Sequence, residues 1–209
     1  NEEKTEEVVA APVSNLNQFD LDYRKQSMHY NITACPFVHL STINGKRVLN
    51  ILHCDIDISS WQTMLLSMVL ADPPVSELIL HGSKLSTQHI INMKDALLYK
   101  DTVTIIKFTY VTFIGGSSVV EELAAILNTG AAYMNFKYCQ LSSDFLLKYS
   151  DLTEKSHCPM NISLNILDLS GNLIDDTGVT QLIQGLYMNV GLKYLSLKKN
   201  NITGTKCLL

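Results

Sequence analysis

The sequence predicts an α/β protein of stacked strand–helix units, with a parallel sheet on one side and helices on the other. A pattern of four apolar residues and one Asn occupies residues 164–174 and returns at residues 192–202, with each matched position 28 residues further on. Apolar residues at the helical period separate the two copies. A fixed period of this size is typical of repeat proteins, in which each unit buries its apolar side against its neighbours.

Six strands are expected at this period. Each contains two apolar residues separated by one position, so that both point to the same face of the sheet. The pairs are Leu49 and Ile51, Leu78 and Leu80, Ile106 and Phe108, Met134 and Phe136, Leu167 and Leu169, and Leu195 and Leu197. Successive pairs are 29, 28, 28, 33 and 28 residues apart. The long step predicts an insertion within residues 148–163, whose polar run at 150–157 is expected to form a loop outside the stack.

Helices are expected between the strands, in residues 60–70, 86–98, 117–127 and 177–186, where apolar residues fall on one stripe. Ser118 and Glu121 fit a capping box at the start of the third helix. Asp57 and the pair Asp175 and Asp176 have the sequence context of turns and helix N-termini, where a carboxylate accepts backbone N–H groups.

The pattern L-x-x-L-x-L-x-x-N-x-I at residues 164–174 resembles the leucine-rich repeat, and the step of 28 is similar to that of the ribonuclease-inhibitor-like class. The resemblance covers residues 48–209. It implies a right-handed solenoid, or horseshoe, with the parallel β-sheet on the concave face and the helices on the convex face. Because helices are wider than strands, such a stack must curve.

The resemblance also implies that Asn172 and Asn200 bond to backbone groups of the neighbouring repeat. The same position in the earlier repeats holds Cys54, Ser83, Val111 and Cys139. A thiol or a hydroxyl can replace part of that bonding, whereas Val cannot. The turns of the first four repeats are therefore expected to be irregular.

Three regions are predicted along the chain. Residues 1–24 lack hydrophobic periodicity, and residues 1–22 carry a net charge of −5, which predicts a disordered or partner-ordered acidic arm. Residues 25–47 contain Asn44-Gly45 between apolar runs, a hairpin signal, and are expected to cap the first repeat. Residues 48–209 hold about six leucine-rich repeats. The last is incomplete, so further repeats or another chain are expected to cover the C-terminal end.

Composition limits the partners. The chain has a net charge of −4, and beyond the arm no basic field remains, which argues against nucleic acid. The longest apolar run, residues 64–71, is too short to cross a membrane. An odd count of five cysteines without paired spacing favours the reducing cytoplasm. Glycosylation sequons at Asn31, Asn161 and Asn201 instead suggest a secreted receptor ectodomain, which is an alternative of lower weight.

The concave face is predicted to bind protein, because it combines Tyr with Lys and Asn on positions that alternate with the buried apolar residues. An alternative is that some of these Tyr side chains pack beneath a neighbouring loop. The predicted protein-binding residues are Lys107, Thr109, Tyr110, Tyr133, Asn135, Lys137, Tyr138, Asp168, Ser170, Tyr194, Ser196 and Lys198.

The sequence contains no G-x-S-x-G, P-loop, H-E-x-x-H or C-x-x-C motif, so neither an enzyme nor a cofactor is predicted. Cys35 and His39, together with His53 and Cys54, could bind zinc, but their spacing is not that of a usual zinc site, and no metal is predicted.

These observations predict a non-catalytic protein–protein interaction module, a structural or scaffold subunit of a larger multi-subunit intracellular assembly. The resembling family includes tropomodulin and ciliary axoneme subunits, which implies a cytoskeletal or axonemal setting. It also includes an activator of a small GTPase, so regulation of a small GTPase is the alternative function.

Overall fold

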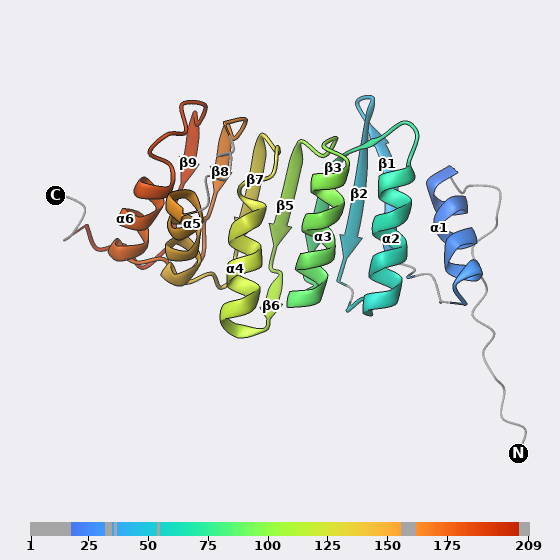
Figure 1. The fold of residues 1–209 in the computed structure, drawn as a ribbon, viewed down its shortest axis with the longest axis horizontal. Coiled ribbons are helices and arrows are strands. Elements are labelled where there is room, and N and C mark those ends of the chain that lie inside the picture. Colours follow the sequence, from blue (N-terminus) through green and yellow to red (C-terminus); the bar gives the residue numbers. More distant parts are fainter. Residues whose placement is uncertain (1–17, 32–34, 36, 54, 156–161, 205–209) are drawn as a thin grey trace, which may run out of the picture.

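Strands and helices alternate along the computed structural model, which describes residues 18–31, 35, 37–53, 55–155 and 162–204. The strands are β1 (Val38–Ile43), β2 (Lys46–Leu52), β3 (Val75–His81), β4 (Lys84–Ser86), β5 (Ile105–Thr109), β6 (Thr112–Ile114), β7 (Tyr133–Lys137), β8 (Ile166–Asp168) and β9 (Tyr194–Ser196). The helices are α1 (Gln18–His29), α2 (Ile58–Leu70), α3 (Thr87–Tyr99), α4 (Gly116–Ile126), α5 (Ser143–Lys155) and α6 (Asp176–Gly185). Figure 1 shows the helices side by side along one face of the strands.

The large sheet has seven strands in the order β1-β2-β3-β5-β7-β8-β9. β1 is antiparallel to β2, and every later pair is parallel. Ile106 pairs with Met134, Met134 with Leu167, and Leu167 with Leu195. The prediction that matching positions of successive units are like-directed neighbours in one sheet is therefore confirmed. A second sheet pairs β4 with β6, which the sequence pattern does not indicate.

The core lies between the sheet and the helices. Leu78 and Leu80 of β3 and Phe108 of β5 are fully buried, as is Trp61 of α2. Each such side chain contributes roughly 1.5–3 kcal/mol through removal from water. The Trp61 indole is not left unsatisfied, because its Nε1 donates a hydrogen bond to the carbonyl of His89 in α3 (2.9 Å). That bond ties neighbouring units together.

The four predicted helices are present, and each boundary lies within two residues of its expected position. The predicted capping box of the third helix, at Ser118 and Glu121, is wrong. Gly115 precedes α4 with φ 143°, and a Cβ there would lie 2.2 Å from Thr87 Oγ1. The Ser118 hydroxyl donates to the Gly115 carbonyl (2.9 Å) and so does not cap the helix. A capping box occurs instead in α3, between Ser86 and His89.

The aspartates predicted at helix N-termini have that role. Asp57 Oδ1 accepts a hydrogen bond from Ser60 N (3.0 Å), and Asp175 Oδ1 accepts one from Gly178 N (3.0 Å). Asp176 accepts from the backbone N–H of Thr203 (2.9 Å), which connects α6 to the segment after β9. These contacts give the three carboxylates structural roles at helix N-termini and between segments.

The predicted hairpin is confirmed at the N-terminal edge of the sheet. Asn44 and Gly45 both have positive φ (51° and 77°), as a type I′ turn requires, and β1 pairs with β2 on either side of them. Helix α1 crosses the predicted boundary at residue 24, and its Tyr23 is buried. Residues 1–17 of the predicted arm lie outside the described residues, and the division into three regions stays a prediction.

The predicted insertion overlaps a helix. Residues 150–155, assigned to a loop from their polar composition, form the last part of α5. Phe145, Leu146 and Tyr149 are buried and spaced at the helical period, so the apolar stripe carries the helix into the polar segment. The loop assignment is therefore wrong for these residues, and the rest of the polar run, residues 156 and 157, lies outside the described part of the chain.

Candidate protein-binding face

The open sheet face is the side of β3, β5, β7, β8 and β9 that points away from the helices. Strand pairing arranges its side chains in rows that cross the sheet, as predicted. The central row is Asn50, Ile79, Lys107, Asn135, Asp168 and Ser196, and the preceding row is Val48, Glu77, Ile105, Tyr133, Ile166 and Tyr194. The next row contains Leu52, His81, Thr109 and Lys137.

Two ion pairs connect neighbouring strands on this face. Lys137 Nζ lies 2.9 Å from Asp168 Oδ2, and the two side chains are 36% and 8% exposed. Lys107 Nζ lies 3.4 Å from Glu77 Oε2, with exposures of 32% and 14%. In both pairs the carboxylate side chain is largely covered, and the lysine side chain is about one-third exposed.

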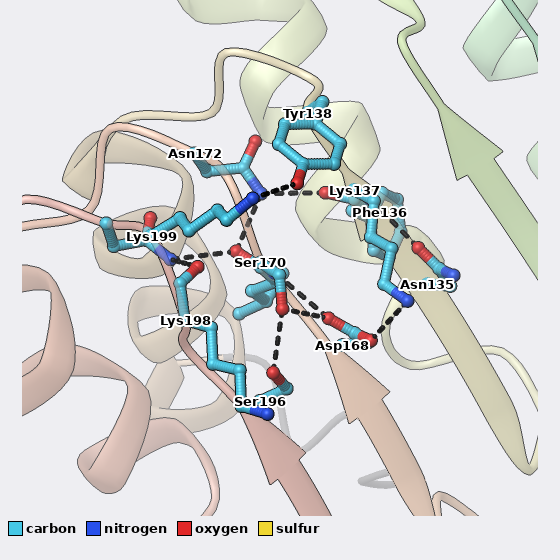
Figure 2. A network of polar contacts seen from close by, with 12 residues as sticks. Asn135, Phe136, Lys137, Tyr138, Asp168, Ser170, Asn172, Ser196, Lys198 and Lys199 are labelled. Atoms are coloured by element: carbon cyan, nitrogen blue, oxygen red, sulfur yellow. Dashed lines mark hydrogen bonds and ion pairs between the residues drawn. The ribbon is translucent and has the colours of Figure 1, made fainter.

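Asp168 is the centre of a hydrogen-bonded network, shown in Figure 2. Its Oδ1 accepts from the backbone N–H of Ser170 (3.0 Å) and from the Ser170 hydroxyl (2.5 Å). Ser170 Oγ lies 2.7 Å from Ser196 Oγ. Since Ser170 gives its single hydroxyl proton to Asp168, Ser196 must be the donor in that contact. The network links β8 and β9 side by side.

The network and the ion pair fix the charge state of Asp168. Burial opposes ionisation, but the hydrogen bonds from Ser170 and Lys137 outweigh it and lower the pKa of the carboxyl below its ordinary value. The hydrogen bond to Asp168 in turn raises the pKa of Lys137. Both groups are therefore charged at neutral pH.

Four of the predicted binding residues are buried, so the expectation of exposure is wrong for them: Asn135, Asp168, Ser170 and Ser196. Asn135 Oδ1 accepts a hydrogen bond from the backbone N–H of Lys137, two residues later (2.9 Å). Asp168 accepts the equivalent bond from the backbone N–H of Ser170. Their polar atoms are occupied in holding the ends of the strands. A contribution of these four to binding stays a prediction.

A row of aromatic rings follows the ends of the strands. Tyr110 and Tyr138 stack with their centroids 4.9 Å apart and their planes 9° apart. His81 meets Tyr110 edge to face at 5.5 Å. At the other end, Lys199 Nζ donates a hydrogen bond to Tyr138 Oη (3.1 Å; Figure 2). Tyr110 is 53% exposed, so part of the stack is open to solvent.

These rings stand on left-handed backbone. The residues at the matching repeat position beyond β2, β3, β5, β7, β8 and β9 all have positive φ. They are His53, Gly82, Tyr110, Tyr138, Gly171 and Lys199. The backbone N–H of Tyr110 donates to the carbonyl of Lys137, and that of Tyr138 to the carbonyl of Ser170, which continues the strand pairing. Non-glycine residues in this conformation cost roughly 1 kcal/mol or more. A tyrosine in this strained conformation indicates that its side chain has a structural or functional role that offsets the strain.

Gly171 provides the space for the Tyr138 ring. A Cβ at position 171 would lie 2.2 Å from Tyr138 Cδ1, so only glycine lets the ring lie over the next unit. The orientation of the stack therefore depends on a residue that carries no side chain.

The remaining predicted residues lie where the rows place them. Tyr194 is 49% exposed at the last strand, and Lys198 is exposed in the turn that follows it. Thr109 and Tyr133 are half-buried, and the Tyr133 ring has Lys107 Nζ 5.4 Å from its centroid. The structure thus brings the predicted tyrosines and lysines together on one face.

The prediction omitted Glu77, His81 and Lys199. Each could have been found by continuing a row with the repeat period: Glu77 precedes Ile105 in one row, and Lys199 is the counterpart of Tyr138 in the last unit. The pairing of Lys199 with Tyr138 has no local signal, because 61 residues separate them.

A hollow of about 440 Å³ lies between β6, α4 and α5, and is lined by Phe113, Val120, Leu141 and Phe145 among others. Cys139 is at its base, and burial raises the pKa of this thiol to about 12. It is therefore protonated at neutral pH and is a poor nucleophile. Within the residues that the structure describes, no three His, Cys, Asp or Glu side chains gather as metal ligands. Cys54 of the zinc hypothesis lies outside them.

No family model and no curated protein matches the chain. Among solved structures, 46 chains match. One is the crystal structure of an internalin from Listeria monocytogenes, with 15% sequence identity and a TM-score of 0.40. The match covers 74% of this chain and 42% of the internalin chain, so this chain spans less than half of that protein.

None of the helices in the described segments combines the length and the apolarity needed to cross a bilayer.

Proposed function

We propose that the chain is a leucine-rich repeat protein of the ribonuclease-inhibitor-like class and that it acts as a non-catalytic protein-binding module. Its open sheet face is then the concave face of a right-handed horseshoe. The stacked Tyr110 and Tyr138 carry this proposal, since two tyrosines are held in a strained backbone conformation with one ring half-exposed to solvent. Exposed aromatic side chains beside cations are typical of interface centres.

The polar groups of the face support binding rather than catalysis. Asp168 is ionised and is engaged by Lys137 and Ser170, so it has no proton to give and its oxygens are occupied. Such a network pre-organises the surface, which lowers the entropic cost of binding a partner.

The setting of the proposed module is an intracellular assembly of several subunits, in the cytoplasm and associated with the cytoskeleton or a ciliary axoneme. Two observations support the cytoplasm. Cys139 is a free thiol, and the cysteine count is odd. Free thiols persist where glutathione and thioredoxin keep them reduced.

Site-specific photo-crosslinking tests the proposal. A photoreactive phenylalanine replaces Tyr110 on the open sheet face or, as the matched control, Tyr99 at the end of α3, which is 83% exposed on the helix layer. Irradiation in an extract of the cells that make the protein is expected to give discrete crosslinked products at position 110 and not at position 99. Absence of products at 110, or the same products at both positions, contradicts the proposal.

A further inference from the structure

The open sheet face carries several lysine side chains beside aromatic rings. Lys107 and Lys137 hold their ammonium groups against the largely covered carboxylates of Glu77 and Asp168, and about one third of each lysine side chain stays exposed. Lys198 and Lys199 are exposed in the turn after β9. The groups that a partner meets first are therefore four ammonium groups and the Tyr110–Tyr138 stack. This is a cationic and aromatic surface on a chain whose net charge is −4.

The positions of these groups match an extended chain. Lys137 ends β7, and Lys198 follows β9, two strands further along the sheet. Neighbouring strands are about 4.8 Å apart, so the two positions lie about 10 Å apart across the sheet. An extended peptide in the polyproline II conformation has three residues per turn and rises about 3.1 Å per residue, so side chains three residues apart point to the same side about 9 Å apart. A peptide that crosses the strands can thus place carboxylates three residues apart on Lys137 and Lys198.

The aromatic stack lies beside this line. Tyr110 and Tyr138 each stand one residue beyond the ends of β5 and β7, and Lys199 continues their row after β9. A side chain from an acidic peptide that points toward the strand ends meets the exposed part of the rings, while its neighbours meet the ammonium groups. Apolar and aromatic side chains gain about 0.5–1.5 kcal/mol from such ring contacts beyond simple burial.

On the basis of the proposed function, we propose that the open sheet face binds an extended acidic segment of a partner protein. The segment crosses β5, β7, β8 and β9, with its carboxylates on Lys107, Lys137, Lys198 and Lys199 and an apolar or aromatic side chain on the Tyr110–Tyr138 stack. Charge complementarity identifies the occupant: the outward groups are cations, and the carboxylates of the face are covered by them. A phosphate backbone is the competing occupant, and it enters the test as an outcome that overturns the proposal.

The test measures fluorescence anisotropy of a labelled 14-residue peptide with five Glu, two Phe and Ser or Ala elsewhere, added to the full chain in 50 mM salt. The comparison probes are the same peptide with Gln in place of Glu, a peptide of residues 1–17 of this chain, and a 14-nucleotide oligothymidylate. Binding of the Glu peptide at least tenfold tighter than that of each comparison probe supports the proposal. Equal or tighter binding of any of the three overturns it.

Two matched double variants localise the binding. K198Q/K199Q removes two cations from the open sheet face, and K25Q/K46Q removes two exposed cations from α1 and the hairpin, with the same change in net charge. The first is expected to weaken binding of the Glu peptide at least fivefold, and the second less than twofold. Equal weakening by both overturns the proposal, because it shows attraction without a site. Circular dichroism checks that both variants fold.

Failure here is separable from failure of the proposed function. If position 110 crosslinks to a protein while the Glu peptide does not bind, the acidic partner is wrong and the binding face stands. If neither occurs, both proposals fall.

Discussion

In the turns after β8 and β9 the amide side chains of Asn172 and Asn200 form hydrogen bonds with the backbone. The matching repeat position after β5 is Val111, whose side chain cannot form hydrogen bonds. Asn172 Oδ1 accepts from Cys139 N (3.0 Å) and Leu141 N (3.1 Å), and its Nδ2 donates to Phe136 O (2.7 Å) and Leu169 O (2.8 Å). Val111 is buried in the apolar core. Both turns nevertheless continue the parallel pairing of the strands.

Cys139 lies between the two cases. Its thiol contacts the carbonyls of Phe108 (3.7 Å), the counterpart of the bond from Asn172 to Phe136, and of Lys137 (3.3 Å), and it has a backbone hydrogen bond with Val111. Ser83 Oγ donates a hydrogen bond to the carbonyl of His81 (3.4 Å). The expectation that a thiol replaces part of this bonding is confirmed at Cys139, whereas the Ser83 bond is not a counterpart of those that Asn172 makes. The turn geometry is thus compatible with either a polar or an apolar side chain beneath it.

The comparison suggests that packing carries more of the stability around β5, and hydrogen bonding more around β8. Phe108 is fully buried and meets Phe113 and Phe136 at centroid distances of 6.0 and 5.2 Å. The predictions that follow test this division, beginning with the largest effect.

Phe108→Ala is expected to lower the free energy of unfolding by about 4 kcal/mol, because it removes a buried ring and leaves a cavity among aromatic neighbours. Urea denaturation measures the change. Tyr99→Ala, at an exposed ring, is the control and is expected to change stability by less than about 0.5 kcal/mol. A cost below about 2 kcal/mol for Phe108→Ala would show that packing is not what stabilises this region.

Asn172→Val is expected to cost about 3 kcal/mol, since it leaves two backbone N–H groups and two carbonyls without their partner in a buried place. The reciprocal change, Val111→Asn, is expected to cost less than about 1 kcal/mol, because an amide there can make the same backbone bonds. Equal costs for the two swaps in urea denaturation would mean that the turns do not differ in what holds them.

The sequence was sufficient to predict the six parallel strands of the large sheet, their register and most helix boundaries, because all three follow from alternation and from one repeat period. It did not predict the burial of Asn135 and Asp168, since alternation gives the side to which a residue points and not what covers it. It also missed the extent of α5, where buried Tyr149 and its stripe outweigh the polar composition of the segment.

The aromatic stack was only partly predictable. The repeat period places Tyr110 and Tyr138 in neighbouring units, and glycine at the same position in other units (Gly82 and Gly171) is a signal for left-handed backbone, but the tyrosines themselves carry no such signal. The space above Gly171 is a property of the assembled sheet. Contacts between units were therefore the feature least predictable from the sequence, because they depend on residues that are distant in the chain.

Asp168→Asn tests the polar region with a pH signature. The folded-state pKa of Asp168 is lowered, so the ionised form adds stability above about pH 4, and that contribution is lost as pH falls through the folded-state value. Asn cannot provide it. The free energy of unfolding of the wild type is expected to exceed that of Asp168→Asn by about 1–2 kcal/mol at pH 7, and the difference is expected to be smaller below pH 3. Urea denaturation across this range measures the difference.

The lowered pKa values of Asp57 and Asp175 do not confuse this comparison, because both chains contain them and their contribution cancels in the difference. A difference between wild type and Asp168→Asn that stays constant from pH 7 to pH 3 would contradict an ionic role for Asp168.

Tyr110→Gly is expected to have the smallest effect on stability, because two contributions oppose each other. Glycine relieves left-handed strain of roughly 1 kcal/mol, and the lost stack on Tyr138 costs about 0.5–1.5 kcal/mol. The net change should lie within about 1 kcal/mol of zero in urea denaturation, while binding of the acidic peptide is lost.

Gly171→Ala makes the complementary change, since it leaves both tyrosines in place and drives a Cβ into the Tyr138 ring while φ stays near 73°. It should destabilise by about 1–2 kcal/mol and displace the ring. If Tyr110→Gly proved as costly as Gly171→Ala and left peptide binding intact, the tyrosine at position 110 would serve the fold rather than a partner. The turns after β5 and β8 would then differ only in how they hold the sheet together.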